Sequence, residues 1–241
     1  MEHTGRAGKG RERSLVAVLV LGGVLLLASF VGLLLFAHFR HNPELPTMKN
    51  VRAADGLTGG LSAGPLGVAL GLTQLGGKPA PGFTLTDQRG RSVSLAAFRG
   101  KVVVLEFMDP HCTDVCPIVS QEYVEAAHLL GRKLSQVAFV GVNVNQFAES
   151  RAAVLRFSRE HRLTTLPNWY FVTGSTAQLR RVWRDYSVTV TPTKTGDVKH
   201  SSVMYFIGRR GRLRYLAFPD DNKAKIRTWA HGITTVARSL L

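Results

Sequence analysis

Cysteine is scarce in this chain. Its 241 residues contain only two thiols, Cys112 and Cys116. A disulfide between residues four apart closes a very short loop and constrains the unfolded chain little, so the spacing argues against an inert structural bridge. Two thiolates also fall short of the four ligands that zinc takes in proteins. The remaining chemistry for the pair is binding of a softer metal ion or thiol–disulfide exchange.

Charged side chains are absent from a long segment near the N-terminus. Residues 14–39 contain no Asp, Glu, Lys or Arg, and about 20 apolar residues suffice to cross the hydrocarbon core of a bilayer. A cleavable signal peptide is the alternative, but its apolar region is shorter, roughly 7–15 residues. We therefore expect a transmembrane anchor at 14–39. The basic flank at 1–13 should stay in the cytoplasm, which places the rest of the chain outside the plasma membrane.

Acidic residues are also few. The chain has 16 Asp and Glu against 31 Lys and Arg, which gives a formal charge of +15. Arginines cluster at Arg180, Arg181 and Arg184, and again at 209–214. Such a charge often indicates nucleic-acid binding, but export across a membrane argues against that partner. Attraction to anionic lipid headgroups or to an acidic partner suits the topology, and so does a plain contribution to solubility.

The composition beyond the anchor divides the chain into a tether and a domain. Residues 40–77 are rich in glycine and contain Pro43 and Pro46, which predicts a flexible tether with short ordered pieces at most. Apolar residues then recur with strand and helix periods, which predicts a folded domain at 78–241.

Strands and helices are predicted to alternate through the first part of this domain. Such alternation implies parallel strands, whereas the later hairpins imply antiparallel ones. We therefore expect an α/β domain of thioredoxin-like fold, with a mixed sheet flanked by helices. The predicted elements are a hairpin at 83–95, strands at 101–107, 136–144 and 168–172, helices at 114–130, 148–161 and from 174, hairpins at 187–198 and 202–218, and a closing helix at 223–241.

Both cysteines fall where the strand at 101–107 runs into the helix at 114–130. Pro117 is tolerated only in the first turn of a helix, which puts both thiols at the helix start. The free N–H groups and the dipole there favour thiolate over thiol. Side chains four apart project from one side of a helical turn, so both sulfurs can point at one spot. Two or three soft ligands satisfy copper(I), and a histidine nitrogen would complete such a shell.

Of eight histidines, His200 is the candidate for that third ligand. It lies at the end of the predicted hairpin at 187–199, just before the next strand, and the loop there can reach the helix start, although a plain surface histidine is the alternative. His111 adjoins Cys112, but neighbours in sequence seldom bind one ion together. The other histidines flank the apolar segment or lie in predicted helices. Glu106 and Asp109 lie close enough in sequence to tune the protonation of the thiols.

Three stretches resemble a known family. They are Cys112-Thr-Asp-Val-Cys-Pro117, Asn168-Trp-Tyr-Phe-Val-Thr-Gly-Ser175 and Val198-Lys-His-Ser-Ser202. They are similar to the Sco/SenC family of membrane-anchored copper proteins that serve cytochrome c oxidase assembly. The resemblance implies a thioredoxin-like fold with Cys112, Cys116 and His200 as copper ligands, and Asp114 as a helix cap or a support for the ligands. It also implies delivery of copper to the dinuclear site of an oxidase subunit, with other copper chaperones or thiol reductants as further partners.

One loop departs from the family pattern. Residues 145–149 read Asn-Gln-Phe-Ala-Glu where the family often has an acidic Asp-Pro-Glu type of sequence. Partner recognition or redox behaviour is therefore expected to differ.

A redox function is the alternative to copper delivery. Cys112 and Cys116 would then be catalytic in a thiol–disulfide oxidoreductase acting on an oxidase subunit or another exported protein. Such enzymes usually carry Cys-x-x-Cys, and the wider gap here together with His200 favours metal.

Overall fold

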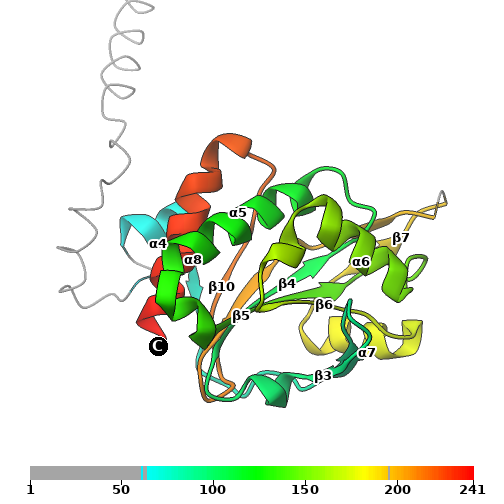
Figure 1. Ribbon diagram of the computed structural model, residues 1–241, viewed down its shortest axis with the longest axis horizontal. Helices are drawn as coiled ribbons and strands as arrows, with labels where there is room; N and C mark the ends of the chain where they lie inside the picture. The colour runs from blue at the N-terminus through cyan, green and yellow to red at the C-terminus, as the bar shows by residue number, and fades with distance from the viewer. Residues whose placement is uncertain (1–60, 62–63, 195) are drawn as a thin grey trace, which may run out of the picture. The chain divides into compact units, whose positions relative to one another are not determined.

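The computed structural model describes residues 61, 64–194 and 196–241 (Figure 1). The predicted cytoplasmic segment at 1–13, the anchor at 14–39 and most of the tether lie outside the described residues and stay predictions. Among the residues that are described, no helix combines the length and hydropathy needed to cross a bilayer.

The described chain is built on a mixed six-stranded sheet, as expected. The strand order is β1-β10-β9-β4-β5-β6; β4, β5 and β6 are parallel, and the other neighbours pair antiparallel. Every residue of β4 and β5 is buried, which explains their continuous apolar sequences. The bounds are β1 Thr73–Gln74, β4 Val102–Met108, β5 Val137–Asn143, β6 Trp169–Val172, β9 Met204–Ile207 and β10 Leu213–Ala217.

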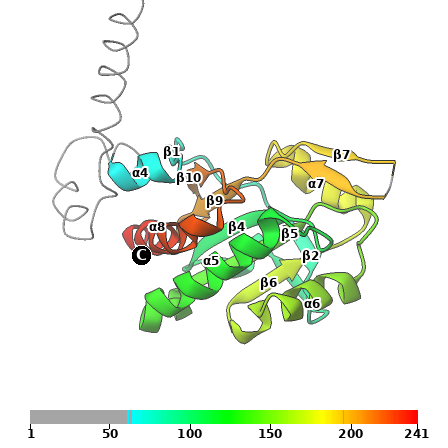
Figure 2. The same cartoon turned by 90° about the horizontal axis from the view of Figure 1, so that it is seen from above.

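Helices cover both faces of this sheet (Figures 1 and 2). Alternate residues of β4 face opposite sides: Val104 packs in one apolar cluster with α5, α6 and α8, and Leu105 packs in a second cluster with α7. Helices α5 and α8 lie side by side, and the Arg238 side chain donates a 2.7 Å hydrogen bond to the Leu129 carbonyl. The bounds are α5 Val115–Leu130, α6 Arg151–Glu160, α7 Thr176–Asp185 and α8 Ile226–Ser239.

Two small hairpins complete the predicted order. Strands β2 (Thr84–Thr86) and β3 (Ser92–Ser94) pair antiparallel, as do β7 (Val190–Pro192) and β8 (Val198–His200). Helix α6 begins three residues later than predicted because the Ser150 side chain caps it by accepting a hydrogen bond from the Ala153 N–H.

Ordered structure begins before residue 78, the predicted start of the domain. Helix α4 spans Pro65–Ala69, and β1 adds to the edge of the sheet by pairing with β10. Leu70 is buried against α8 at Gly232, where an added Cβ would lie only 2.4 Å from the Leu70 Cδ1. The last residues of the segment predicted as a tether therefore belong to the domain, because an apolar side chain there fits a glycine in the distant α8.

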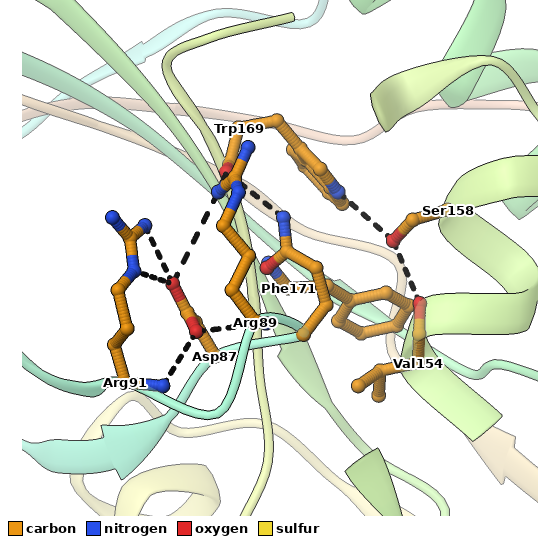
Figure 3. Close-up of polar contacts among 8 residues, drawn as sticks. Asp87, Arg89, Arg91, Val154, Ser158, Trp169 and Phe171 are labelled. Atoms are coloured by element: carbon orange, nitrogen blue, oxygen red, sulfur yellow. Dashed lines mark hydrogen bonds and ion pairs between the residues drawn. The ribbon is translucent and has the colours of Figure 1, made fainter. Parts of the chain in front are cut away.

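The outer edge of β6 is closed by the loop between β2 and β3 (Figure 3). The buried Gln88 side chain donates to the Trp169 carbonyl at 3.0 Å and accepts from the Phe171 N–H at 2.8 Å, as a neighbouring strand would. Asp87 fixes the loop by accepting from the backbone N–H groups of Arg89 and Arg91, both at 2.9 Å. An exposed sheet edge invites pairing with other chains, and this loop removes that risk.

Replacing Gln88→Ala is expected to lower the free energy of unfolding by about 1–3 kcal/mol. The buried Phe171 N–H would lose its partner, whereas the Trp169 carbonyl keeps a 2.9 Å hydrogen bond from the Arg89 side chain. Chemical denaturation measures the change. Gln121→Ala, on the exposed face of α5, is the matched control and should stay within about 0.5 kcal/mol of the parent protein. Equal stability of the two variants would contradict this role.

Two carboxyl groups are buried in the layer between the sheet and α5. Glu106 lies on β4 and Glu122 on α5, and the Glu106 Oε2 and both Glu122 carboxyl oxygens have no hydrogen-bond partner among the described residues. Burial raises the pKa of Glu122 to about 8, with a further contribution from the charge of Asp220. Burial, and next the nearby Glu122, raise the pKa of Glu106 well above its usual range.

The raised pKa of Glu122 makes stability depend on pH. The folded protein keeps this proton up to about pH 8, whereas the unfolded chain loses it near pH 4.5, so stability falls as pH rises through this window. Glu122→Gln carries no titrating proton at this position. Its free energy of unfolding should therefore fall less between pH 5 and pH 8 than that of the parent protein, by a difference on the order of a few kcal/mol. Denaturation at pH 5 and pH 8 measures it. Glu125→Gln, exposed on the same helix, should leave the pH dependence unchanged.

Candidate metal centre

The thiols lie where β4 passes into α5, but the helix does not contain both. Cys116 is buried in the first turn of α5, whereas Cys112 precedes the capping residue Asp114 and lies in the loop. The predicted helical i, i+4 geometry is therefore wrong for Cys112. The loop instead folds back so that the Cys116 N–H donates to the Cys112 Sγ at 3.3 Å. Both cysteines are free thiols.

Asp114 caps α5 and also contacts the outer thiol. Its Oδ1 accepts from the Val115 N–H at 2.7 Å and from the Cys112 Sγ at 2.9 Å. The interpretation of Asp114 as a helix cap is confirmed. The same carboxylate thus ends the loop and fixes the rotamer of Cys112.

Asp109 and Asn145 hold the start of the loop. The Asp109 Oδ1 accepts from the His111 N–H at 2.8 Å and from the Asn145 Nδ2 at 3.0 Å, and its carbonyl accepts from the Cys112 N–H at 3.1 Å. Both side chains are buried. The contact joins the unusual 145–149 loop directly to the thiol loop. Sequence reasoning missed this role of Asn145, although both residues follow adjacent parallel strands, whose ends lie at one edge of a sheet.

The two thiols have different acidities. Hydrogen bonding to the Cys116 side chain lowers the pKa of Cys112, although partial burial opposes it. The pKa of Cys116 is raised well above its usual range by the hydrogen bond with Cys112 and by burial, and also by the charges of Cys112 and Glu106. Cys112 is therefore the more acidic thiol of the pair, and Cys116 the less acidic one.

Alkylation should distinguish the two thiols. At neutral pH, iodoacetamide should modify Cys112 first and leave Cys116 free in the folded protein, because the thiolate is the reactive species and Cys116 is almost fully buried. Peptide mass spectrometry locates the adduct. Denatured protein is the control and should be alkylated at both positions. Preferential modification of Cys116 in the folded state would contradict the assignment.

His200 faces the same cavity as the outer thiol. A cavity of about 340 Å³ is lined by Cys112, Asp109, Asp114, His200 and residues around them. The His200 Nδ1 lies 3.0 Å from the Ser201 carbonyl, which can only accept, so Nδ1 carries the proton and Nε2 keeps a free lone pair. Burial lowers the pKa of His200, which favours the neutral imidazole that a metal requires.

The predicted ligands are close but not assembled. No group of three His, Cys, Asp or Glu side chains in the described part of the chain is placed to hold a metal ion. Cys112 and His200 line the cavity, and His200 reaches it from the β7–β8 hairpin. Cys116 contacts Cys112 but is not part of the cavity lining. The His111 Nε2 lies 3.3 Å from the Arg156 guanidinium, which directs the ring toward α6. Binding through all three predicted ligands would thus require movement of the hairpin or of the loop.

Comparison with known proteins places the chain in a family. A family model described as SCO1/SenC matches residues 73–235. The chain belongs to the SCO1/SenC family. The bovine protein described as mitochondrial SCO2 homolog is 29% identical over 136 residues, which cover 54% of this chain and 50% of that protein. The Bacillus subtilis SCO1 homolog is 24% identical over 134 residues, covering 54% of this chain and 69% of that protein.

Solved Sco structures share the fold. Bradyrhizobium japonicum ScoI with copper bound superposes with a TM-score of 0.56 at 26% identity, covering 68% of this chain and 99% of that chain. Apo Sco1 from Thermus thermophilus gives a TM-score of 0.59 at 25% identity, covering 70% of this chain and 95% of that chain. The family resemblance and the thioredoxin-like α/β fold expected from the sequence are thereby confirmed. The chain spans about half the length of the bovine relative.

Proposed function

We propose that this Sco-family protein is a copper chaperone, anchored in the plasma membrane by residues 14–39 with its N-terminus cytoplasmic. It would bind copper(I) through Cys112, Cys116 and His200 and deliver the ion to the dinuclear copper site of a cytochrome c oxidase subunit. The observation that carries the proposal is the free Nε2 of a neutral His200 on the cavity that Cys112 lines. The likeness to copper-bound ScoI supports copper as the cargo.

The difference in acidity between the thiols suits stepwise loading. Cys112, with the lowered pKa and partial exposure, would meet the ion first as a thiolate. Cys116 would then exchange its proton for the metal, since thiolates and not thiols bind copper. The open cavity leaves room for an acceptor ligand to approach, so the ion could pass by ligand exchange. A tether beside a membrane-embedded acceptor raises the local concentration without any new contact.

Copper titration of the reduced full chain tests the proposal. Cys112→Ser or Cys116→Ser should remove tight copper(I) binding, as measured by competition with a chromophoric chelator. His200→Ala should weaken binding by at least about tenfold, equivalent to 1.4 kcal/mol. His128→Ala, on the exposed face of α5, is the matched control and should bind as the parent does. Unchanged affinity in a Cys112→Ser, Cys116→Ser double variant would refute copper binding at this site.

The adjacent free thiols of unequal acidity favour a second candidate, thiol–disulfide exchange. The Cys112 thiolate would attack a substrate disulfide, and Cys116 would then displace the substrate. The substrate gains two electrons, and the protein is left with a Cys112–Cys116 disulfide. His200 takes no part in that chemistry, so an insulin-reduction assay on His200→Ala separates the two roles. Loss of copper affinity with reductase activity retained indicates that His200 is a metal ligand, whereas unchanged copper affinity would show that His200 does not bind the ion.

A further inference from the structure

A cluster of positive charge lies at the turn between β9 and β10. Its six cationic side chains are all exposed and are brought together by contacts between three segments. The Gly100 N–H donates to the Arg209 carbonyl and the Leu213 N–H to the Lys78 carbonyl, both at 2.9 Å. We call this cluster the basic pole, and its members are Lys78, Arg99, Arg209, Arg210, Arg212 and Arg214.

No aspartate or glutamate of the described residues pairs with the basic pole. None of the six takes part in an ion pair between the residues that the structure describes. Asp and Glu are absent from the sequence at 64–86, 88–105 and 203–219, which supply the pole and its surroundings. The other arginine cluster differs, because Arg181 and Arg184 on α7 both approach Asp185, at 3.7 and 3.6 Å. Arg209 also donates hydrogen bonds to the Leu241 and Gly100 backbone oxygens, at 2.8 and 3.0 Å, and the other five cations of the basic pole supply most of the charge available to a partner.

An apolar hollow lies within the pole. A cavity of about 120 Å³ has Leu95, Phe98 and Ile207 in its lining, together with the cationic Arg99 and Lys101. Apolar walls beside positive charges suit an amphipathic anion, which presents a charged group next to a hydrocarbon portion. A small inorganic anion would pair with the positive side chains but would make no contact with the apolar lining.

The basic pole and the thiols lie at opposite ends of one strand. Val102 begins β4 beside Lys101, and Met108 ends it beside the thiol loop. Strand β9 runs antiparallel, with Ile207 paired to Val103, so the turn that follows β9 lies at the start of β4 (Figure 1). Seven residues at about 3.3 Å each separate the two ends by roughly 20 Å.

We propose that the basic pole binds anionic phospholipid headgroups, so that the thiol cavity points away from the membrane. The proposal rests on the proposed anchor at 14–39, which would keep the domain beside a bilayer. Residues 40–63 could span at most roughly 80 Å, so the pole is within reach of the surface. Positive side chains near an anionic leaflet are attracted to it within a Debye length. Docking at this end would leave Cys112 and His200 open to a partner that protrudes from the membrane.

Energy transfer from two single labels to the lipid surface tests the orientation. The full chain carries Cys112→Ser and Cys116→Ser, so that one new cysteine takes the donor dye. Ala97→Cys places the dye beside the basic pole and Thr113→Cys places it at the thiol end; both positions are exposed. The chain is reconstituted into nanodiscs with acceptor-labelled headgroups, made of phosphatidylcholine alone or mixed with phosphatidylglycerol.

In the mixed nanodiscs, transfer should be stronger from the label at 97 than from the label at 113. The difference should be lost in pure phosphatidylcholine and at high salt. The difference in transfer between the two labels should also disappear in the triple variant Arg209→Gln, Arg210→Gln, Arg212→Gln. The matched control, Arg180→Gln, Arg181→Gln and Arg184→Gln, removes the same charge from α7 and should retain it.

Equal transfer from the two labels in the mixed nanodiscs would overturn the proposal and leave an acidic protein as the partner of the basic pole. An equal loss in both triple variants would also overturn it, since net charge alone would then explain the effect. A chain that enters neither kind of nanodisc would overturn the anchor and the orientation together. Copper titration of the chain with intact cysteines reports separately on the proposed function.

Discussion

Complete burial of the parallel strands β4 and β5 is the constraint on which the site depends. Helices cover one face of the pair, and α7 with the β2–β3 hairpin covers the other, so the buried polar residues at and just beyond the ends of these strands must find partners within the protein. Asn143 donates to the Ala148 carbonyl, and Asn145 donates to Asp109. Those hydrogen bonds fix both loops beyond the sheet. The thiol loop keeps its shape because its first residue is held by the neighbouring strand's loop.

One sheet thus separates two kinds of chemistry along the length of β4. At its carboxyl end lie the two thiols, beside the start of α5. Their mutual hydrogen bond lowers the pKa of Cys112 and, together with burial, raises the pKa of Cys116. At its amino end a tight turn gathers arginines that form no ion pair with Asp or Glu among the described residues. Between the two ends, Glu106 and Glu122 are buried in the layer under α5. Burial raises the pKa of both carboxyl groups and so favours their neutral forms. The ends of the strand are therefore suited to different partners.

The sequence predicted most elements because their signals are local. Periodic apolar residues, the glycine turns and Pro117 place α5, the hairpins and the closing helix near their observed positions. The exceptions depend on distant contacts. Cys112 was assigned to a helical turn, yet its loop is shaped by hydrogen bonds to Asp109 and Asp114. Likewise, Gln88 carries no local sign that it completes the edge of β6, some 80 residues further along the chain.

The sequence by itself determined the family, the order of strands and helices, and which sulfur and imidazole groups could serve as ligands. These follow from residue types and spacings, which need no knowledge of distant contacts. Only the tertiary structure decided that His200 and Cys112 border one cavity, that Nε2 is the free nitrogen, and that the arginines at 209–214 lie opposite the thiols. Such relations depend on strand order and register, which are set by packing between segments up to about a hundred residues apart.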